Sequence, residues 1–181
     1  VGLLFQDPDD QLFSPTVIED VAFGPLNLGK RKADARRIAL DCLTRVDLAE
    51  AADRPPHHLS FGERKRACLA GVLACDPTVL VLDEPLNGLD PMGRAEMISL
   101  FKELAHAGRH VIVSSHILHE VDLISDSVIM IHGGAIVAEG EIREVRGDAD
   151  AGRRDQRAPQ GPQEQQDDQH GQAAAPQQLA L

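Results

Sequence analysis

Short, continuous apolar runs alternate along the chain with longer segments in which apolar residues recur every three or four positions. The runs are "VGLLF" (1–5), "TVLVL" (78–82) and "HVIVSS" (110–115), and each predicts a buried strand. The run 78–82 is apolar at every position after the first, which is typical of a strand covered on both faces, as in a parallel sheet. Helical spacing is found in three segments: 33–52, 92–108 and 116–125. Strands that alternate with helices predict an α/β fold with a parallel β-sheet core and right-handed crossovers.

Capping residues predict where two further helices begin. Thr16 and Glu19 have the spacing of a capping box, so we expect a helix from there to about Pro25. Ser60 and Glu63 have the same spacing at the start of "SFGERKRACLAGVLA", and they predict a second capped helix.

The chain changes character after about residue 147. Before that point, "SVIMIHGGAIVAEG" predicts a hairpin that turns at Gly133–Gly134. Residues 148–181 are rich in Gln, Ala, Asp and Pro, and such a segment cannot bury enough surface to offset its chain entropy. We therefore expect a folded unit, 1–147, and a disordered low-complexity tail, 148–181. Two interpretations of the tail stay open: an inert extension, and an extension that is out of frame.

Composition restricts the function more than the fold. The formal net charge is −11, which argues against a general nucleic-acid-binding protein. The chain has no Trp and no Tyr, so its core must be aliphatic. No apolar run approaches the roughly 20 residues that a membrane span requires. The cysteines lack metal-ligand spacing and are expected to be buried thiols in a reducing compartment: Cys42, Cys68 and Cys75.

The start of the helix at Ser60 has the features of an anion site. Gly62 lets a ligand approach the backbone, and free N–H groups at a helix start attract phosphate. Three basic residues are expected to add positive charge there: Arg64, Lys65 and Arg66. The alternative is an ordinary capped helix whose basic residues form a solvated face.

Two adjacent carboxylates, Asp83 and Glu84, follow the apolar run 78–82. Carboxylates at the carboxyl end of a parallel strand lie where such sheets bind ligands. One can hold Mg²⁺ while its neighbour takes a proton from an attacking water, a division of labour that suits phosphoryl transfer. His116 follows the next run and is expected at the same edge, within reach of a γ-phosphate.

Five short motifs together resemble those of the ATP-binding-cassette (ABC) ATPases. "LSFGE" (59–63) resembles the family's signature motif, usually LSGGQ, and "VLVLDEP" (79–85) resembles its Walker B strand with the catalytic glutamate. "NGLD" resembles the D-loop, "SSH" the switch histidine, and "LLFQD" the Q-loop. The motifs occur in the family's order and at family-like spacing. By resemblance, the chain is a partial, P-loop NTPase-like ABC ATPase with a helical signature subdomain.

The resemblance implies a role for each matching residue. Glu84 would polarise the attacking water, His116 would contact the γ-phosphate, and Asp83 would support Mg²⁺. In the family two cassettes pack head to tail, so that each signature helix closes the other's ATP site. Nucleotide, metal or interface contacts are implied for Gln6, Ser60, Gly62, Glu63 and Asp90, with Gln6 also serving as a metal ligand.

The chain departs from the family pattern in two ways. Phe61 occupies a signature glycine position, and Glu63 replaces the usual Gln. We predict that the Phe61 ring turns away from the helix start and packs against apolar neighbours. In addition, no G-x-x-x-x-G-K-S/T segment occurs in the sequence, so the phosphate-cradling loop is expected upstream of residue 1 and the chain alone is expected to be inactive.

The Q-loop region indicates a branch of the family. "FQDPDDQLFSPTVIEDVAFGPLNLG" resembles energy-coupling-factor and cobalt/nickel importers, which implies a transition-metal ion or a vitamin as cargo. The implied partners are a second cassette, identical or different, and a transmembrane subunit that meets residues 6–24, which would place the chain peripherally on the cytoplasmic face of the membrane. Two alternatives stay open: a non-transport ABC ATPase, and a non-catalytic product that only pairs with an intact subunit.

Overall fold

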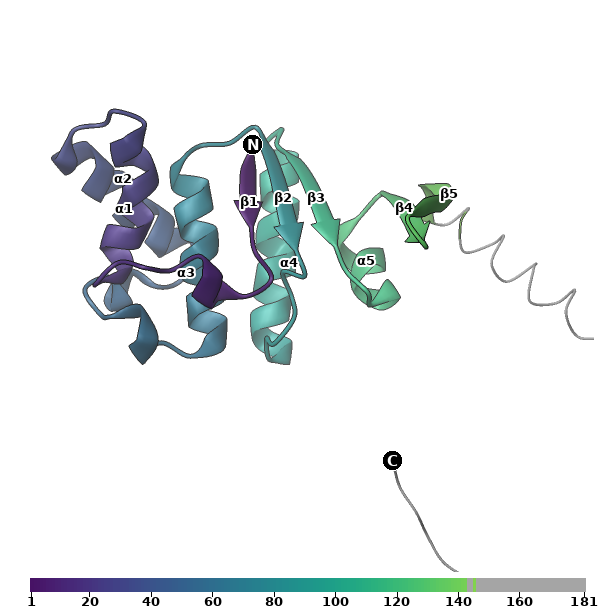
Figure 1. Cartoon of the computed structure of the whole chain (residues 1–181), viewed down its shortest axis with the longest axis horizontal. Helices are drawn as coiled ribbons and strands as arrows, with labels where there is room; N and C mark the ends of the chain where they lie inside the picture. The colour runs from purple at the N-terminus through teal and green to yellow at the C-terminus, as the bar shows by residue number, and fades with distance from the viewer. Residues whose placement is uncertain (143–144, 146–181) are drawn as a thin grey trace, which may run out of the picture.

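The computed structural model describes residues 1–142 and residue 145 (Figure 1). In chain order the strands and helices are β1 (Gly2–Leu4), α1 (Val17–Asn27), α2 (Lys32–Arg45), α3 (Phe61–Ala74), β2 (Val79–Asp83), α4 (Pro91–His106), β3 (His110–Ser114), α5 (Leu118–Ile124), β4 (Ser127–His132) and β5 (Ala135–Glu141). Short 3₁₀ turns cover Pro8–Asp10, Ala49–Ala51 and Pro56–His58. The predicted α/β fold is confirmed. The predicted disorder of the tail lies outside the described residues.

Strand β2 is the centre of a three-stranded parallel sheet, with β1 on one side and β3 on the other. The aligned row Leu4, Leu82 and Val113 lies on the covered face, where Leu4 and Leu82 are fully buried. In the adjacent row, Leu3 is 47% and Ile112 57% exposed. The prediction that the strand at 78–82 is covered on both faces is therefore wrong for the described residues: Val79 and Val81 on β2 are half-buried, because the helices that contact the sheet cover one face.

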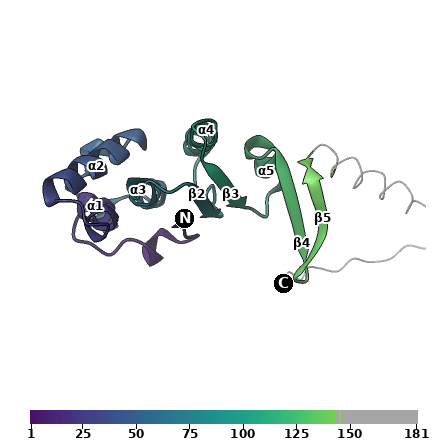
Figure 2. The ribbon, with the colours of Figure 1, turned by 90° about the horizontal axis from the view of Figure 1, so that it is seen from above.

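The aliphatic core lies between the sheet and the helices. Helices α1, α2 and α3 contact one another, α3 also contacts β1, and α4 contacts β3 (Figure 2). Leu69 on α3 and Leu104 on α4 are fully buried, and Phe101 is the one aromatic ring in the core of the described part. The expected aliphatic core is thus present, and it holds α3 and α4 next to the strand ends.

Helix α1 begins at Val17 directly after Thr16, as predicted, but its capping bond and its end differ from the prediction. The Thr16 side chain makes no capping hydrogen bond; instead Asp20 Oδ1 accepts from the N–H groups of Phe13 and Ser14 at 3.1 and 3.0 Å. Helix α1 also continues past Pro25 to Asn27, because packing of the buried Pro25 offsets the hydrogen bond that proline cannot donate.

The helix expected over 33–52 ends early, at Arg45. Asp47 adopts a left-handed conformation with φ 55°, and the Leu48 N–H donates to Leu43 O at 2.8 Å. This closure satisfies carbonyls at the helix end, and Asp tolerates the left-handed region better than most residues. The helical spacing alone did not reveal this stop.

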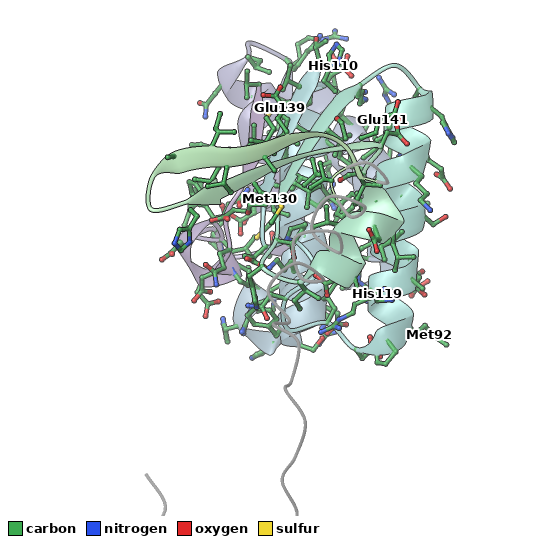
Figure 3. The ribbon with its side chains drawn as sticks, turned by 90° about the vertical axis from the view of Figure 1, so that its right-hand side faces the viewer. Met92, His110, His119, Met130, Glu139 and Glu141 are labelled. Atoms are coloured by element: carbon green, nitrogen blue, oxygen red, sulfur yellow. The ribbon has the colours of Figure 1, made fainter. Side chains whose placement is uncertain are left out.

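The predicted hairpin is present. Strands β4 and β5 pair antiparallel, and Gly133 and Gly134 at the turn have φ of 58° and 80°, a region that favours glycine. Figure 3 looks onto this hairpin, with Met130 on β4 and Glu139 and Glu141 on β5. In the part of the chain that the structure describes, every helix is too short or too polar to cross a bilayer.

The cysteines follow the prediction in part. Cys42 and Cys68 are buried, and burial raises the pKa of the Cys68 thiol to about 12. Cys75 is exposed at the C-terminal end of α3, contrary to the expectation that all three are buried.

Candidate active site

The carboxyl ends of the three parallel strands bring together side chains that are far apart in the sequence. Gln6 follows β1, Asp83 ends β2 with Glu84 directly after it, and His116 follows β3. Asp83 pairs in register with Ser114, which places these strand ends at one edge of the sheet. In Figure 3 the start of α4 at Met92 and His119 of α5 lie at one end of the molecule, and His110, which begins β3, lies at the other.

Glu84 and His116 contact each other directly. Glu84 Oε1 lies 2.8 Å from His116 Nδ1 and also accepts the His116 backbone N–H at 3.1 Å. The hydrogen bond to Glu84, together with its negative charge, raises the pKa of His116 above its usual value. The Glu84 side chain is 16% exposed, whereas that of His116 is 69% exposed and can reach a ligand. The two predicted catalytic residues therefore form one proton-holding pair.

Ser114 contacts the carboxylate of Asp83 and the backbone N–H of Glu84, and the sequence analysis assigned it no role. Its hydroxyl donates to Asp83 Oδ1 at 2.5 Å, and its Oγ accepts the Glu84 N–H at 3.1 Å. Its backbone carbonyl also accepts the Glu84 N–H, at 3.2 Å. The "SSH" motif could have suggested this contact, because parallel register puts the last residue of β3 beside that of β2.

A cleft of about 560 Å³ opens at this edge. Its lining includes both predicted metal ligands, Gln6 and Asp83, together with Phe5, Asp7, Asp10, Phe61 and Asn87. Among the described residues no group of three or more His, Cys, Asp or Glu side chains could hold a metal ion by itself. Asp83 and Gln6 supply a carboxylate and an amide oxygen to the cleft, and Mg²⁺ is usually bound through one or two carboxylates together with substrate phosphates and water.

The capping box predicted at α3 is confirmed. Ser60 Oγ accepts the Glu63 N–H at 3.3 Å, and the Ser60 N–H donates to Glu63 Oε2 at 2.7 Å. These hydrogen bonds lower the pKa of Glu63 and commit its carboxylate to the cap. An ideal Cβ on Gly62 would lie 3.2 Å from Leu89 Cδ2, so this turn of α3 packs close to the loop before α4.

The Phe61 ring lies against the backbone of Gly88, where a Cβ would come within 2.5 Å of ring carbon Cε1. The ring is also part of the cleft lining. The cations of Lys65 and Arg64 lie 5.8 and 6.0 Å from the ring centroid. The ring thus packs against a loop backbone and lies beside two cations. The prediction that it packs against apolar neighbours differs from these contacts.

The three basic residues after the cap were expected to add positive charge at the helix start, but the structure places them differently. Lys65 is fully buried, and its Nζ donates to the carbonyl oxygens of Gln6 at 3.1 Å and Glu84 at 2.6 Å. Burial lowers its pKa. Arg64 and Arg66 instead pair with Asp9 at 3.2 Å and Glu96 at 3.5 Å.

Asp90 caps α4, where its Oδ1 accepts the Gly93 N–H at 2.9 Å. Arg94 on the same helix donates to Leu89 O at 3.1 Å and lies 3.5 Å from Glu120, which is nearly buried. Glu120 in turn accepts from Ser115 Oγ at 3.2 Å. These contacts connect the loop before α4 with the loop that carries His116, and the sequence analysis did not identify Arg94 or Glu120.

One segment, "GPLNLGKR" (24–31), is similar in sequence to the phosphate-binding motif G-x-x-x-x-G-K-S/T, but it ends in Arg where the motif requires Ser or Thr. Gly24 lies inside α1, so tightly against Cys75 Sγ that a side chain would not fit. A phosphate-binding loop follows a strand and opens a helix, whereas this segment ends one helix. It is a helix–helix connection.

The comparisons with known proteins match this geometry. Residues 1–87 match the family described as ABC transporter. The chain is 45% identical over 145 residues to the energy-coupling factor transporter ATP-binding protein EcfA of Methanosphaera stadtmanae, covering 80% of this chain and 52% of that protein. The chain belongs to the ABC transporter ATP-binding family. A relative of the same name, EcfA from Methanocaldococcus jannaschii, is 45% identical over 150 residues, covering 83% of this chain and 54% of that protein.

Two solved ABC structures share the fold of this cassette. CbiO1 from Clostridium perfringens, described as part of the ABC transporter complex CbiONQ, has a TM-score of 0.73 at 38% identity, over 84% of this chain and 61% of that one. The cassette MJ0796, in a dimeric post-hydrolysis state bound to ADP and Pi, has a TM-score of 0.69 at 26% identity, over 78% of this chain and 62% of that one. The chain spans about half the length of the curated relatives it matches.

Proposed function

We propose that this ABC cassette hydrolyses ATP to power an importer of the energy-coupling-factor type. The observation that carries the proposal is the contact of Glu84 with His116 beside Asp83 and Gln6, at one edge of a parallel sheet. This arrangement provides the base, the polar contact and the metal-binding oxygens that phosphoryl transfer requires. The cargo class is a transition-metal ion or a vitamin, which the cassette itself does not touch.

In the proposed reaction Glu84 is the general base. Its carboxylate takes a proton from the water that attacks the γ-phosphate, and its hydrogen bonds to His116 hold it at the sheet edge. The exposed imidazole of His116 is free to turn to the phosphate. Asp83 and Gln6 would hold Mg²⁺ with the phosphates, and the ion supplies charge neutralisation when bound.

The site is completed by a second cassette in this proposal. Ser60 and Gly62 lie at the start of α3, where helix N–H groups favour the γ-phosphate held by the partner. Asp90 is assigned to the interface between cassettes. The dimeric state of MJ0796 bound to ADP and Pi supports this assembly. The Glu63 carboxylate is engaged in the cap, so its contribution to the nucleotide site acts through the conformation of the first turn.

The transmembrane partner is assigned to the segment after β1. A second cleft, of about 390 Å³, lies there beside the exposed Phe13, whose ring meets Phe23 edge to face at 4.9 Å. Its lining combines apolar and charged groups: Asp9, Leu12, Phe13, Ser14, Pro56, His57 and Arg64. A groove of this kind suits a short helix from a membrane subunit, and it would place the cassette peripherally on the cytoplasmic face of the membrane.

Turnover is proposed to require a G-x-x-x-x-G-K-S/T segment in addition to these 181 residues, because a phosphate cradle is needed to position ATP. The test compares phosphate release by the chain alone with release by the chain joined at its N-terminus to a segment that contains G-x-x-x-x-G-K-S/T. We expect turnover only in the joined protein, and a loss of at least about a hundredfold in its Glu84→Gln variant while ATP binding survives. Turnover by the joined protein that is indifferent to Glu84→Gln would refute the assigned base.

A further inference from the structure

Lys65 is a buried cation that the proposed mechanism does not use. Within the described part of the chain, the buried charged side chains are Lys65, with no exposed surface, and Glu120. Both hydrogen-bond partners of the Lys65 ammonium are main-chain carbonyl groups, those of Gln6 and Glu84. Burying an ammonium group is costly unless its hydrogen bonds are well placed, so an apolar residue of similar size would fill the space at lower cost.

The peptide that Lys65 holds is strained. Glu84 has φ 43°, a left-handed conformation that is unfavourable for a residue with a side chain and persists only where the surroundings impose it. Four residues hold it here. Ser114 accepts the Glu84 N–H and His116 binds the carboxylate. The Glu84 carbonyl accepts from the Lys65 ammonium at 2.6 Å and from the Asn87 N–H at 3.2 Å.

The same ammonium also donates to the carbonyl of Gln6, the second residue after β1, at 3.1 Å. Helix α3, which carries Lys65, begins at Phe61 after the N-cap Ser60, about one turn before Lys65. The helix assigned to the partner's nucleotide is therefore bonded, through one side chain, to both Gln6 and Glu84 of this chain's own site.

Resting on the proposed function, we propose that Lys65 is a positioning residue that fixes the left-handed peptide of Glu84 and the Gln6 loop to helix α3. Glu84 and the loop that contains Gln6 then keep their positions relative to each other, and both move with α3 when α3 moves. Without the ammonium, the Glu84 carbonyl would keep only the Asn87 N–H, at 3.2 Å, and the turn would relax, taking the carboxylate away from its contact with His116. A misplacement of about 1 Å lowers turnover by about a hundredfold.

The first test needs no nucleotide. Hydrogen exchange of the 181-residue chain is followed by mass spectrometry in three segments: 4–12, 82–90 and, as a remote reference, 32–45. Lys65→Met should raise exchange by about tenfold in the first two segments together and leave 32–45 unchanged. Lys65→Gln, which keeps donors without the charge, should lie between Met and wild type. The matched control is Lys102→Met, an exposed lysine on α4, which should change none of them.

A rise of equal size in all three segments, or no rise in 4–12 and 82–90, would overturn the proposal, because Lys65 would then support the fold in general or nothing at all. If Lys65→Met does not fold, the same comparison is made with Lys65→Gln. A second test measures turnover by the cassette joined to a phosphate-loop segment. There Lys65→Met should lower kcat by about a hundredfold with KM changed less than about threefold, and Lys65→Gln should recover part of kcat.

The two tests separate the two proposals. If the joined protein does not hydrolyse ATP even without substitutions, the proposed function fails, while the exchange result still decides whether Lys65 couples the two segments. If the wild type is active and Lys65→Met retains its kcat, the positioning role fails and the proposed function stands.

Discussion

Replacing Gly88 by alanine tests the contact between the D-loop segment and the Phe61 ring. Gly88 has φ +75°, and a Cβ built there would lie 2.5 Å from Phe61 Cε1 and 2.7 Å from Cδ1. Two effects should therefore add. The left-handed conformation costs an alanine about 1–2 kcal/mol, and forcing a methyl group into a packed site costs about 1–3 kcal/mol more. We expect Gly88→Ala to lower the free energy of unfolding by about 2–5 kcal/mol.

Gly108 provides a matched control for the backbone effect. It has φ +86°, and no atom lies within 4 Å of the position of its Cβ. Gly108→Ala should therefore show only the left-handed cost of about 1–2 kcal/mol. Urea denaturation of both variants gives the difference, which measures the contact with the ring.

A second comparison uses Phe61→Ala as the background. Without the ring, Gly88→Ala should be no more destabilising than Gly108→Ala, so the coupling between positions 61 and 88 should be about 1–3 kcal/mol. The reasoning is refuted if Gly88→Ala and Gly108→Ala cost the same in the wild-type background, because the ring would then not rest on this loop.

Three further predictions follow from single contacts. Ser60→Ala should lower the free energy of unfolding by about 1 kcal/mol, while Thr16→Ala, at a helix start without a side-chain cap bond, should cost clearly less; equal losses in urea denaturation would contradict the difference in capping. The pKa of His116, followed by NMR, should lie above the usual value and fall in Glu84→Gln. Because the folded-state pKa is raised, the stabilisation from this pair is fully present below the usual histidine pKa and is lost as the pH rises through the folded value; an unchanged pKa in Glu84→Gln would show that the pair does not form. Under native conditions a thiol reagent should label the exposed Cys75 first, with Cys42 and Cys68 reacting only on unfolding, and equal rates at all three would refute their burial.

Much of the candidate site could be predicted because it depends on local chemistry. A capping box such as that of Ser60 and Glu63 involves residues three apart, so its spacing is visible in the sequence and the structure confirms it. Strand ends are visible in the same way, and parallel pairing then puts Asp83, Glu84 and His116 at one edge. The roles of these residues in turnover remain predictions.

Other features could not be predicted, because they depend on what packs against a residue. Lys65 sits in a run of three basic residues whose charge pattern indicates a solvated face. Its position on α3 instead turns it under the strand ends, where two carbonyl groups receive it. Thr16 has the sequence of a cap, but Asp20 takes the nearby N–H groups.

The sequence by itself determined the order of strands and helices, the parallel sheet, the hairpin turn and the family, because each depends on periodicity, on turn residues or on short motifs at set spacing. Only the tertiary structure decided which face of the strands is covered, that the Phe61 ring lies on Gly88, and that Ser114, Lys65, Arg94 and Glu120 support the loops of the site. The physical reason is the same in each case. Burial and hydrogen-bond partners across elements are set by the angle and distance at which helices pack on the sheet, and no local pattern carries that information.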